Sequence, residues 1–369
     1  MRIGWLDTAK GFAIVGIVLI HVAAWAPADS EIARWVLDHL VMPLPVFFIV
    51  SGILAGPALT AHDTPARHLV TRITPLLYLY VLWQPGVFVY RLVGHSSAGE
   101  DLDLIGETAR VIAAFVRPNG EIWYLWALAL HFVLVWLTRR LPAVVVLSAL
   151  TVVGAWVIGW GRSVVGDDLW HVAGPGLQGL PQFAFLTAIG AHLGPRLIAN
   201  ADRFGSPPVA VVAVCVWVAV GEAHARSTGI MEHALAVLHV VIGTASALVI
   251  ARVLDDLRVT NPIRALGRWS IVPYLTHTAV IVGLLASAEL LGATPFLVAH
   301  PTGTIAALTV VATLAGLVGY WPVRGTRADH LFRPPPAVHR WSDRPPRDRS
   351  SADILGGHRA PPRDESTVP

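Results

Sequence analysis

Three side chains that could do chemistry lie within one apolar stretch, Trp5 to Ala26 (WLDTAKGFAIVGIVLIHVAAWA): Asp7, Lys10 and His21. In an α-helix the residues from Lys10 to His21 complete three turns plus about 20°, so both lie on one face, roughly 16 Å apart along the axis. Asp7 precedes Lys10 by about one turn on nearly the same face. Cationic and imidazole groups inside a membrane helix are costly unless they face protein, water or a ligand.

These residue types suit acyl transfer. An unperturbed imidazole titrates near pH 6.5, so His21 could deprotonate a hydroxyl that attacks a thioester, or accept the acyl group itself. Lys10 could hold a phosphate or carboxylate, and Asp7 could hold Lys10 in place. The alternative is structural: His21 bonds a neighbouring carbonyl, and Lys10 extends to the headgroups. Spacing alone favours neither interpretation.

Other candidates occur in later apolar stretches. Arg72, with Arg67 before it, begins the third stretch and could grip a nucleotide phosphate, although basic residues are also ordinary at a cytoplasmic membrane boundary. The remaining candidates are substrate-binding residues, each of which has a packing or membrane-interface alternative. They are Ser51 beside Gly52, Trp123 and Tyr124 in EIWYLW, and Ser270, Tyr274 and His277, whose spacings of four and three place them on one helix face.

Composition identifies a membrane protein. Hydrophobic residues make up 54% and charged residues 14%, with a mean hydropathy of +0.61. Basic residues are dispersed over loops and a tail, so no nucleic-acid partner is expected. The single cysteine, Cys215, excludes an internal disulfide and a cysteine-based metal cluster. Neither a metal-ligand motif nor a glycine-rich cofactor loop is found, so no metal and no bound cofactor are predicted.

The predicted fold is all-α: a polytopic bundle of about ten transmembrane helices in a lipid bilayer. The apolar runs are roughly 5–26, 36–59, 69–91, 122–138, 141–160, 180–198, 207–221, 232–254, 269–291 and 303–321. With both termini cytoplasmic, 21 of the 27 Lys and Arg residues fall inside, as the positive-inside rule expects. The predicted domains are a transmembrane domain over 1–323 and a disordered Arg/Pro-rich cytoplasmic tail over 324–369. The sequence gives no indication of oligomeric state.

The longest outer connection, 92–121, also contains apolar residues with helical spacing. Leu104, Ile105, Ile112 and Phe115 predict an amphipathic helix on the outer surface. Such a helix could pack on the bundle or cover a substrate.

Five stretches, in order, resemble the acyltransferase-3 family of integral membrane acyltransferases, with the fucose 4-O-acetylase-like O-acetyltransferases as the most similar branch. They are WLDTAKGFAIVGIVLIH, PLPVFFIVSGIL, IWYLWAL, FLTAIGAHLG and LGRWSIVPYLTH. The main family motif is a basic residue, ten residues and a histidine in the first span, which Lys10 and His21 match. Many members carry Arg-x-x-Arg entering the third span. Arg72 fits the second position, Leu69 stands at the first, and Arg67 is nearby.

The resemblance implies an enzyme that moves an acyl group, usually acetyl from acetyl-CoA, to a hydroxyl of a cell-surface or secreted carbohydrate or glycolipid. It implies that His21 is essential, that Lys10 is its basic partner, and that acyl-CoA is a co-substrate. The expected location is a cell membrane, the bacterial inner or plasma membrane. The competing class is a transporter or flippase whose buried His and Lys line a solute path.

Overall fold

The structure, a computed structural model, describes residues 3–27, 29–118 and 120–336, and within these the regular elements are helices. The helices in chain order are α1 (Gly4–Ala24), α2 (Glu31–His39), α3 (Pro43–Leu59), α4 (Ala66–Ser97), α5 (Leu104–Ala113), α6 (Trp123–Thr138), α7 (Ala143–Val165), α8 (Asp167–Ala199), α9 (Ala201–Phe204), α10 (Pro207–Ala225), α11 (Ile230–Asp255), α12 (Asn261–Arg268), α13 (Ile271–Leu290), α14 (Thr294–Ala299) and α15 (Pro301–Tyr320). Short 3-10 turns cover Arg258–Thr260, Trp321–Val323 and Arg327–Leu331. The prediction of an all-α bundle is confirmed.

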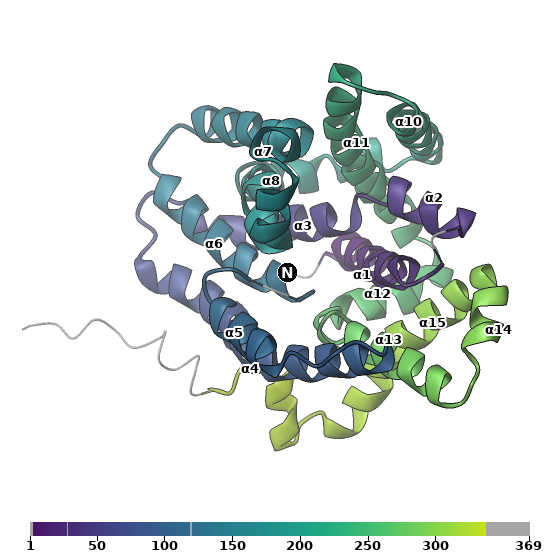
Figure 1. Ribbon diagram of the computed structural model, residues 1–369. Helices are drawn as coiled ribbons and strands as arrows, with labels where there is room; N and C mark the ends of the chain where they lie inside the picture. The colour runs from purple at the N-terminus through teal and green to yellow at the C-terminus, as the bar shows by residue number, and fades with distance from the viewer. Residues whose placement is uncertain (1–2, 28, 119, 337–369) are drawn as a thin grey trace, which may run out of the picture.

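Helices α1 and α3 lie in the middle of the bundle, and α4, α7, α10 and α14 lie toward its outside (Figure 1). The two central helices supply much of the core, which includes the fully buried side chains of Ile14, Val18 and Phe48. The outer helices bury little of their length: Gly221 is the buried residue of α10. The apolar sequence of α10 therefore faces outward, as a helix surrounded by lipid would.

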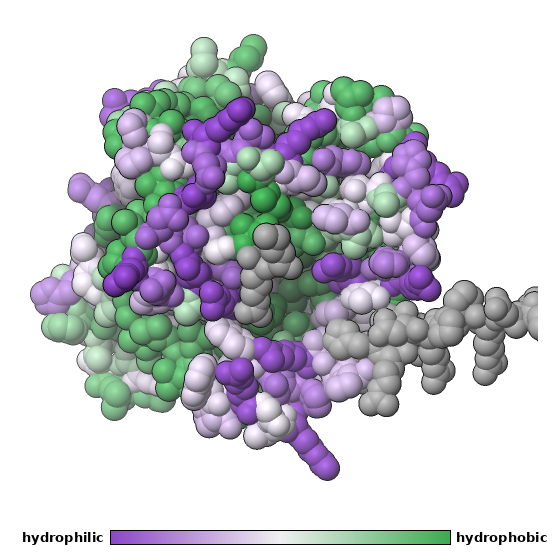
Figure 2. Space-filling model, turned by 180° about the vertical axis from the view of Figure 1, so that it is seen from behind, coloured by the Kyte–Doolittle hydropathy of each residue, from purple (hydrophilic) through white to green (hydrophobic). Residues whose placement is uncertain are grey.

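Eight segments of the described chain are long and apolar enough to cross a membrane. They are Gly4–Ala24, Glu31–Leu59, Ala66–Ser97, Ala143–Val165, Pro207–Ala225, Ile230–Asp255, Ile271–Leu290 and Pro301–Val323. The remaining two predicted spans coincide with α6, a shorter apolar helix, and with the second part of α8. Figure 2 shows hydrophilic residues across the middle of one face of the molecule and hydrophobic residues along much of its edge. The chain is a multi-pass membrane protein.

One predicted span and one long helix are interrupted. The run 36–59 is divided at Leu40, whose ψ of 57° is not helical, so that α3 begins afresh at Pro43. Proline is suited to this first helical position because it has no N–H to leave unpaired. In α8 the backbone turns at Gly174, where φ is 68° and ψ is 173°. Because φ is positive there, glycine is the residue that adopts this conformation without strain.

The bundle interior depends on a close crossing of α3 and α8. A Cβ atom added at Gly52 would overlap the carbonyl oxygen of Thr187, and one added at Gly56 would overlap that of Ala191. A Cβ added at Gly190 would in turn overlap the carbonyl of Ile49. Small residues thus bring the two backbones into direct contact, as in other membrane helix pairs. Gly52 therefore has the packing role that the sequence left open for the Ser51–Gly52 pair.

The first residues of the predicted tail pack on the bundle. Trp83 Nε1 donates to the Leu331 carbonyl at 2.7 Å, and Tyr78 donates to the His330 carbonyl at 3.1 Å. Phe332 is buried against Trp83 and Tyr320. The remainder of the predicted tail, 337–369, lies outside the described residues.

The α3–α8 contact predicts that Gly52→Ala destabilises the protein by at least about 1 kcal/mol, because neither backbone can move away from the added methyl. The matched control is Gly283→Ala in α13, where nothing lies within 4 Å of the added Cβ. Alanine is the better helix former by about 1 kcal/mol, so the control should be neutral or slightly stabilised. The measurement is the temperature at which half the protein leaves the monodisperse peak in size-exclusion chromatography. Equal midpoints for the two variants would contradict this account of the crossing.

Candidate active site

His21 lies in the last turn of α1 with one ring nitrogen already bonded. Its Nδ1 is 2.8 Å from the carbonyl oxygen of Ile17, one turn earlier in the same helix. A carbonyl only accepts, so in the neutral ring Nδ1 carries the hydrogen and Nε2 keeps its lone pair. The local bond therefore fixes the tautomer in which Nε2 can take a proton from a hydroxyl.

His21 belongs to a row of aromatic side chains. The His277 ring meets it edge to face, with centroids 4.8 Å apart. His277 also donates from Nδ1 to backbone carbonyls of its own helix, and its buried Nε2 has no hydrogen-bond partner within the described chain. The Tyr274 ring lies 6.3 Å from His277 and 5.6 Å from Tyr124.

The row ends at Ser51 of α3. Ser51 Oγ and the Tyr124 hydroxyl oxygen lie 2.8 Å apart. The tyrosine hydroxyl donates to the Phe47 carbonyl at 3.3 Å, which leaves its oxygen to accept from Ser51. Tyr274 donates to the backbone carbonyl of Glu121 at 2.6 Å, so the start of α6 is fixed to α13. The structure thus brings Ser51, Tyr124, Tyr274, His277 and His21, predicted from four separate stretches, into one continuous row.

His21 opens into a cavity of about 400 Å³, termed here the His21 cavity. Trp123 lines it, and so do charged residues from α4, α5 and the connection before α6. The lining residues are His21, Arg91, Arg110, Ala113, Arg117, Pro118, Gly120, Glu121, Trp123, His171, Gly174 and Pro175. A proton acceptor, an aromatic face and several polar groups therefore surround one space of a size that suits a small ligand.

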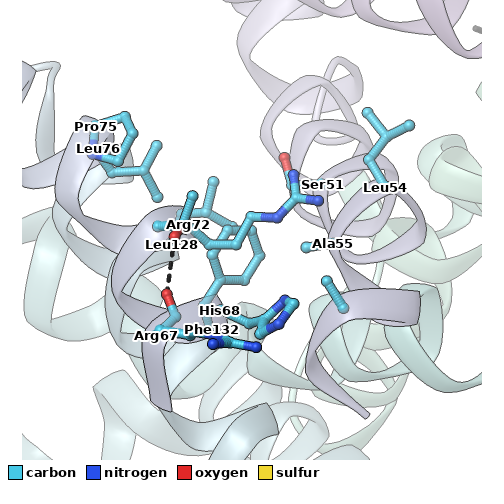
Figure 3. A pocket seen from close by; sticks show the side chains of 12 residues that line it. Ser51, Leu54, Ala55, Arg67, His68, Arg72, Pro75, Leu76, Leu128 and Phe132 are labelled. Atoms are coloured by element: carbon cyan, nitrogen blue, oxygen red, sulfur yellow. Dashed lines mark hydrogen bonds between the residues drawn. The ribbon is translucent and has the colours of Figure 1, made fainter. Parts of the chain in front are cut away.

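A second cavity, of about 760 Å³ and termed the Arg72 cavity, lies between the end of α3 and the start of α4 (Figure 3). Arg67, His68 and Arg72 line it on one side and Ser51 on the other. In Figure 3 the Arg72 side chain extends from α4 toward α3 and Ser51. Leu69, at the first position of the family's Arg-x-x-Arg pair, is buried in the core instead. Arg67 and Arg72, predicted as an anion grip, thus share a cavity, and His68 is a third basic group there that the sequence did not single out.

The two cavities lie toward opposite ends of the same helices. Arg72 and Arg91, one from each cavity, are separated by roughly 28 Å along α4. In α6, Trp123 lines the His21 cavity, whereas Leu128 and Phe132 line the Arg72 cavity. Tyr124 stands between them, bonded to Ser51 of the Arg72 cavity and adjacent in the chain to Trp123. The row from Ser51 to His21 therefore forms part of the wall between the two spaces.

Lys10 lines neither cavity. Its Nζ is 2.7 Å from Asp7 Oδ1, and Arg268 of α12 approaches the other carboxylate oxygen at 3.5 Å. The Asp7–Lys10 pair expected from the spacing is therefore present, and both side chains are mostly covered, at 12% and 19% exposure. Gly11 and Gly267 allow α1 and α12 to come into backbone contact at this end. Lys10 and His21 are consequently at opposite ends of α1, as predicted.

Ser270 is the substrate-binding candidate that the structure separates from the others. It is the residue before α13, half-buried, and its carbonyl accepts the backbone N–H of Tyr274 at 3.0 Å. Its side chain lines neither cavity. Conversely, Arg91, Arg110 and Arg117 enter the His21 cavity although the sequence suggested no role for them. One signal was present: they are three of only six basic residues assigned to the outer side, where the positive-inside rule expects few.

Comparison with known proteins assigns the family. The family model Acyl_transf_3, described as an acyltransferase domain, matches residues 3–321. The chain belongs to the acyltransferase-3 family. Neither the curated proteins nor the solved structures include a significant match. This acyltransferase is therefore a membrane enzyme that transfers acyl groups, and the family match covers α1 to α15 together with both cavities.

Helix α5 of the acyltransferase is present where the amphipathic pattern predicted it, but its apolar residues face outward. Ile105 is 85% exposed and Ile112 69%, whereas Glu107 is the buried residue of the helix. Glu107 accepts two hydrogen bonds from Arg91 of α4, at 2.7 and 3.0 Å. An ion pair, rather than apolar packing, thus holds α5 over the His21 cavity and leaves its apolar face exposed, as in helices that lie on a membrane surface.

The Arg91 hydrogen bonds lower the pKa of Glu107. A lowered pKa means that the folded state favours the carboxylate, so this contribution is present at neutral pH and is lost as the pH falls through the lowered pKa. Glu107→Gln removes the charge at all pH values. We expect backbone hydrogen exchange over 104–113 to become at least about tenfold faster at pH 7, because charge-assisted hydrogen bonds are lost.

Glu100→Gln is the matched control, because Glu100 is an exposed carboxylate that pairs with His95. In wild-type protein, exchange corrected for intrinsic rates should approach that of Glu107→Gln only under acid conditions. Unchanged protection of α5 in Glu107→Gln would show that another contact holds the helix.

Proposed function

We propose that the protein is an O-acetyltransferase that moves an acetyl group from acetyl-CoA to a hydroxyl of a carbohydrate or glycolipid of the cell envelope, as the fucose 4-O-acetylase-like branch of the family does. The observation that carries the proposal is the pair of cavities with a shared wall. One holds clustered cations, which suit the phosphates of CoA. The other holds His21 with Nε2 free to accept a proton.

In this mechanism acetyl-CoA enters the Arg72 cavity. Arg67, His68 and Arg72 bind its phosphates, and the extended pantetheine arm passes the shared wall beside Ser51 and Tyr124, so that the thioester reaches His21. Lys10 is at the same end of the bundle but is paired with Asp7. Its proposed contribution is to attract the polyanionic donor to this face.

The acceptor sugar enters the His21 cavity, where Trp123 offers an aromatic face for stacking. His21 Nε2 takes the proton of the attacking hydroxyl as its oxygen bonds to the thioester carbonyl carbon. The carbon–sulfur bond then breaks, and the His21 proton passes to the CoA thiolate, so that the products are the acetyl ester and free CoA. His277, whose buried Nε2 lacks a partner among the described residues, lies beside His21 and can accept a hydrogen bond from protonated His21.

His21→Ala should abolish acetyl transfer while the protein remains folded and inserted, because it removes the Nε2 that takes the hydroxyl proton, and the neighbouring His277 Nε2 is buried and does not line the cavity. The measurement combines purified protein, acetyl-CoA labelled in the acetyl group and an envelope glycan extract, with size-exclusion chromatography to test folding. Loss of activity by at least about 100-fold is expected from removal of a general base. Full activity in a folded His21→Ala protein would overturn the proposal, as would gradient-driven solute uptake without acetyl transfer, the behaviour of a transporter.

Arg72→Gln tests the donor cavity. It should raise the KM for acetyl-CoA by about tenfold, the effect of losing one charge-assisted contact, with little change in the KM for acceptor. The control is Arg140→Gln, an exposed arginine after α6 that lines neither cavity. A KM for acetyl-CoA that responds equally to both variants would remove Arg72 from the donor site.

A further inference from the structure

Three arginines meet at the His21 cavity from three different parts of the chain. Arg91 comes from α4, Arg110 from α5 and Arg117 from the connection that follows α5. These residues account for half of the six basic residues assigned to the outer side of the membrane. The positive-inside rule expects few arginines in outer segments. The convergence of these three arginines beside His21 therefore indicates a site for a specific anion.

The carboxylates nearby compensate only part of this cluster of three cations. Glu107 pairs with Arg91 and, at 3.4 Å, with Arg110 as well, although it does not line the cavity. Glu121 does line it, and its carboxylate accepts a short hydrogen bond from the Tyr90 hydroxyl.

Arg117 has no carboxylate partner within the described residues. It is exposed, and its Nη2 donates to the His171 backbone carbonyl at 3.3 Å, a long hydrogen bond to a neutral acceptor. The guanidinium thus retains donors and an uncompensated charge at the cavity edge. Like charges held together repel unless a ligand neutralises them.

We propose that the His21 cavity selects an anionic acceptor: a sugar that carries a carboxylate or phosphate beside the hydroxyl to be acetylated. Arg117 and Arg110 bind the anion, and the hydroxyl faces His21 Nε2. This inference rests on the proposed function and specifies the substrate class of the same site. The stacking residue Trp123 holds the ring, and the arginines determine which ring is accepted.

Model glycosides that differ at one carbon test the selection. The probes are 4-methylumbelliferyl β-D-glucuronide, the corresponding β-D-glucoside, and the β-D-glucoside 6-phosphate, each assayed for acetylation and for equilibrium binding to purified protein. Wild-type protein should favour at least one anionic probe over the glucoside by about tenfold or more, the effect of a charge-assisted contact. The glucuronide and the phosphate arms distinguish the two sources of the anion.

Arg117→Gln and Arg110→Gln should reduce the preference for the anionic probe to near unity, mainly through its KM and binding constant. The matched control is Arg226→Gln, an exposed outer-side arginine directly after α10 that pairs with Glu222 and lines neither cavity. It should keep the wild-type preference.

Equal or tighter binding of the glucoside, no binding of either anionic probe at millimolar concentration, or a preference that survives both variants would overturn the inference. Failure of the proposed function gives a different result: wild-type protein would then show no acetyl transfer, or His21→Ala would retain it. His21-dependent transfer to neutral sugars alone would sustain the function and reject the anionic acceptor.

Discussion

A polar side chain within a membrane-spanning helix must find a partner or line a cavity, because hydrocarbon offers it neither a hydrogen bond nor a counter-charge. This constraint explains the arrangement around α1. At one end Lys10 is paired with Asp7, and Arg268 of α12 approaches the same carboxylate. At the other end His21 donates a hydrogen bond from Nδ1 to a carbonyl of its own helix, and its side chain lines a cavity. The other helices of the bundle enclose both ends of α1. The backbone contacts of α3 with α8 and of α1 with α12 hold these helices close together.

The same constraint accounts for the path between the cavities. Ser51, Tyr124, Tyr274 and His277 are polar groups in the bundle interior, and each is satisfied by the next or by a backbone carbonyl. The exception is His277 Nε2, which is buried and without a partner in the described chain. A buried acceptor without a donor costs free energy, and such a cost is typical of groups reserved for a ligand. Its position beside His21 agrees with a site where a hydroxyl must be held before it reacts.

Much of the fold was predictable because apolar runs in a membrane protein have one stable outcome, the helix. The Asp7–Lys10 pair was predictable for a similar reason, since residues three apart on one helix must meet. The interruption at Leu40 was not, because a hydropathy run does not reveal where its backbone turns. The convergence of Arg91, Arg110 and Arg117 was also hidden, since it depends on how α5 is held by Glu107 and not on any local pattern. Ser270 shows the converse: sharing a helix face with Tyr274 and His277 does not place a side chain in the site.

We propose that donor and acceptor approach from opposite sides of the membrane. Sealed proteoliposomes test this arrangement, because CoA and a charged glycoside do not cross a bilayer. Labelled acetyl-CoA is supplied outside, and 4-methylumbelliferyl β-D-glucuronide is either enclosed inside or added outside, with His21→Ala protein as the blank. We expect labelled ester when the two substrates occupy opposite compartments and none when both are outside. Ester formed only when both substrates share a compartment would rule out approach from opposite sides.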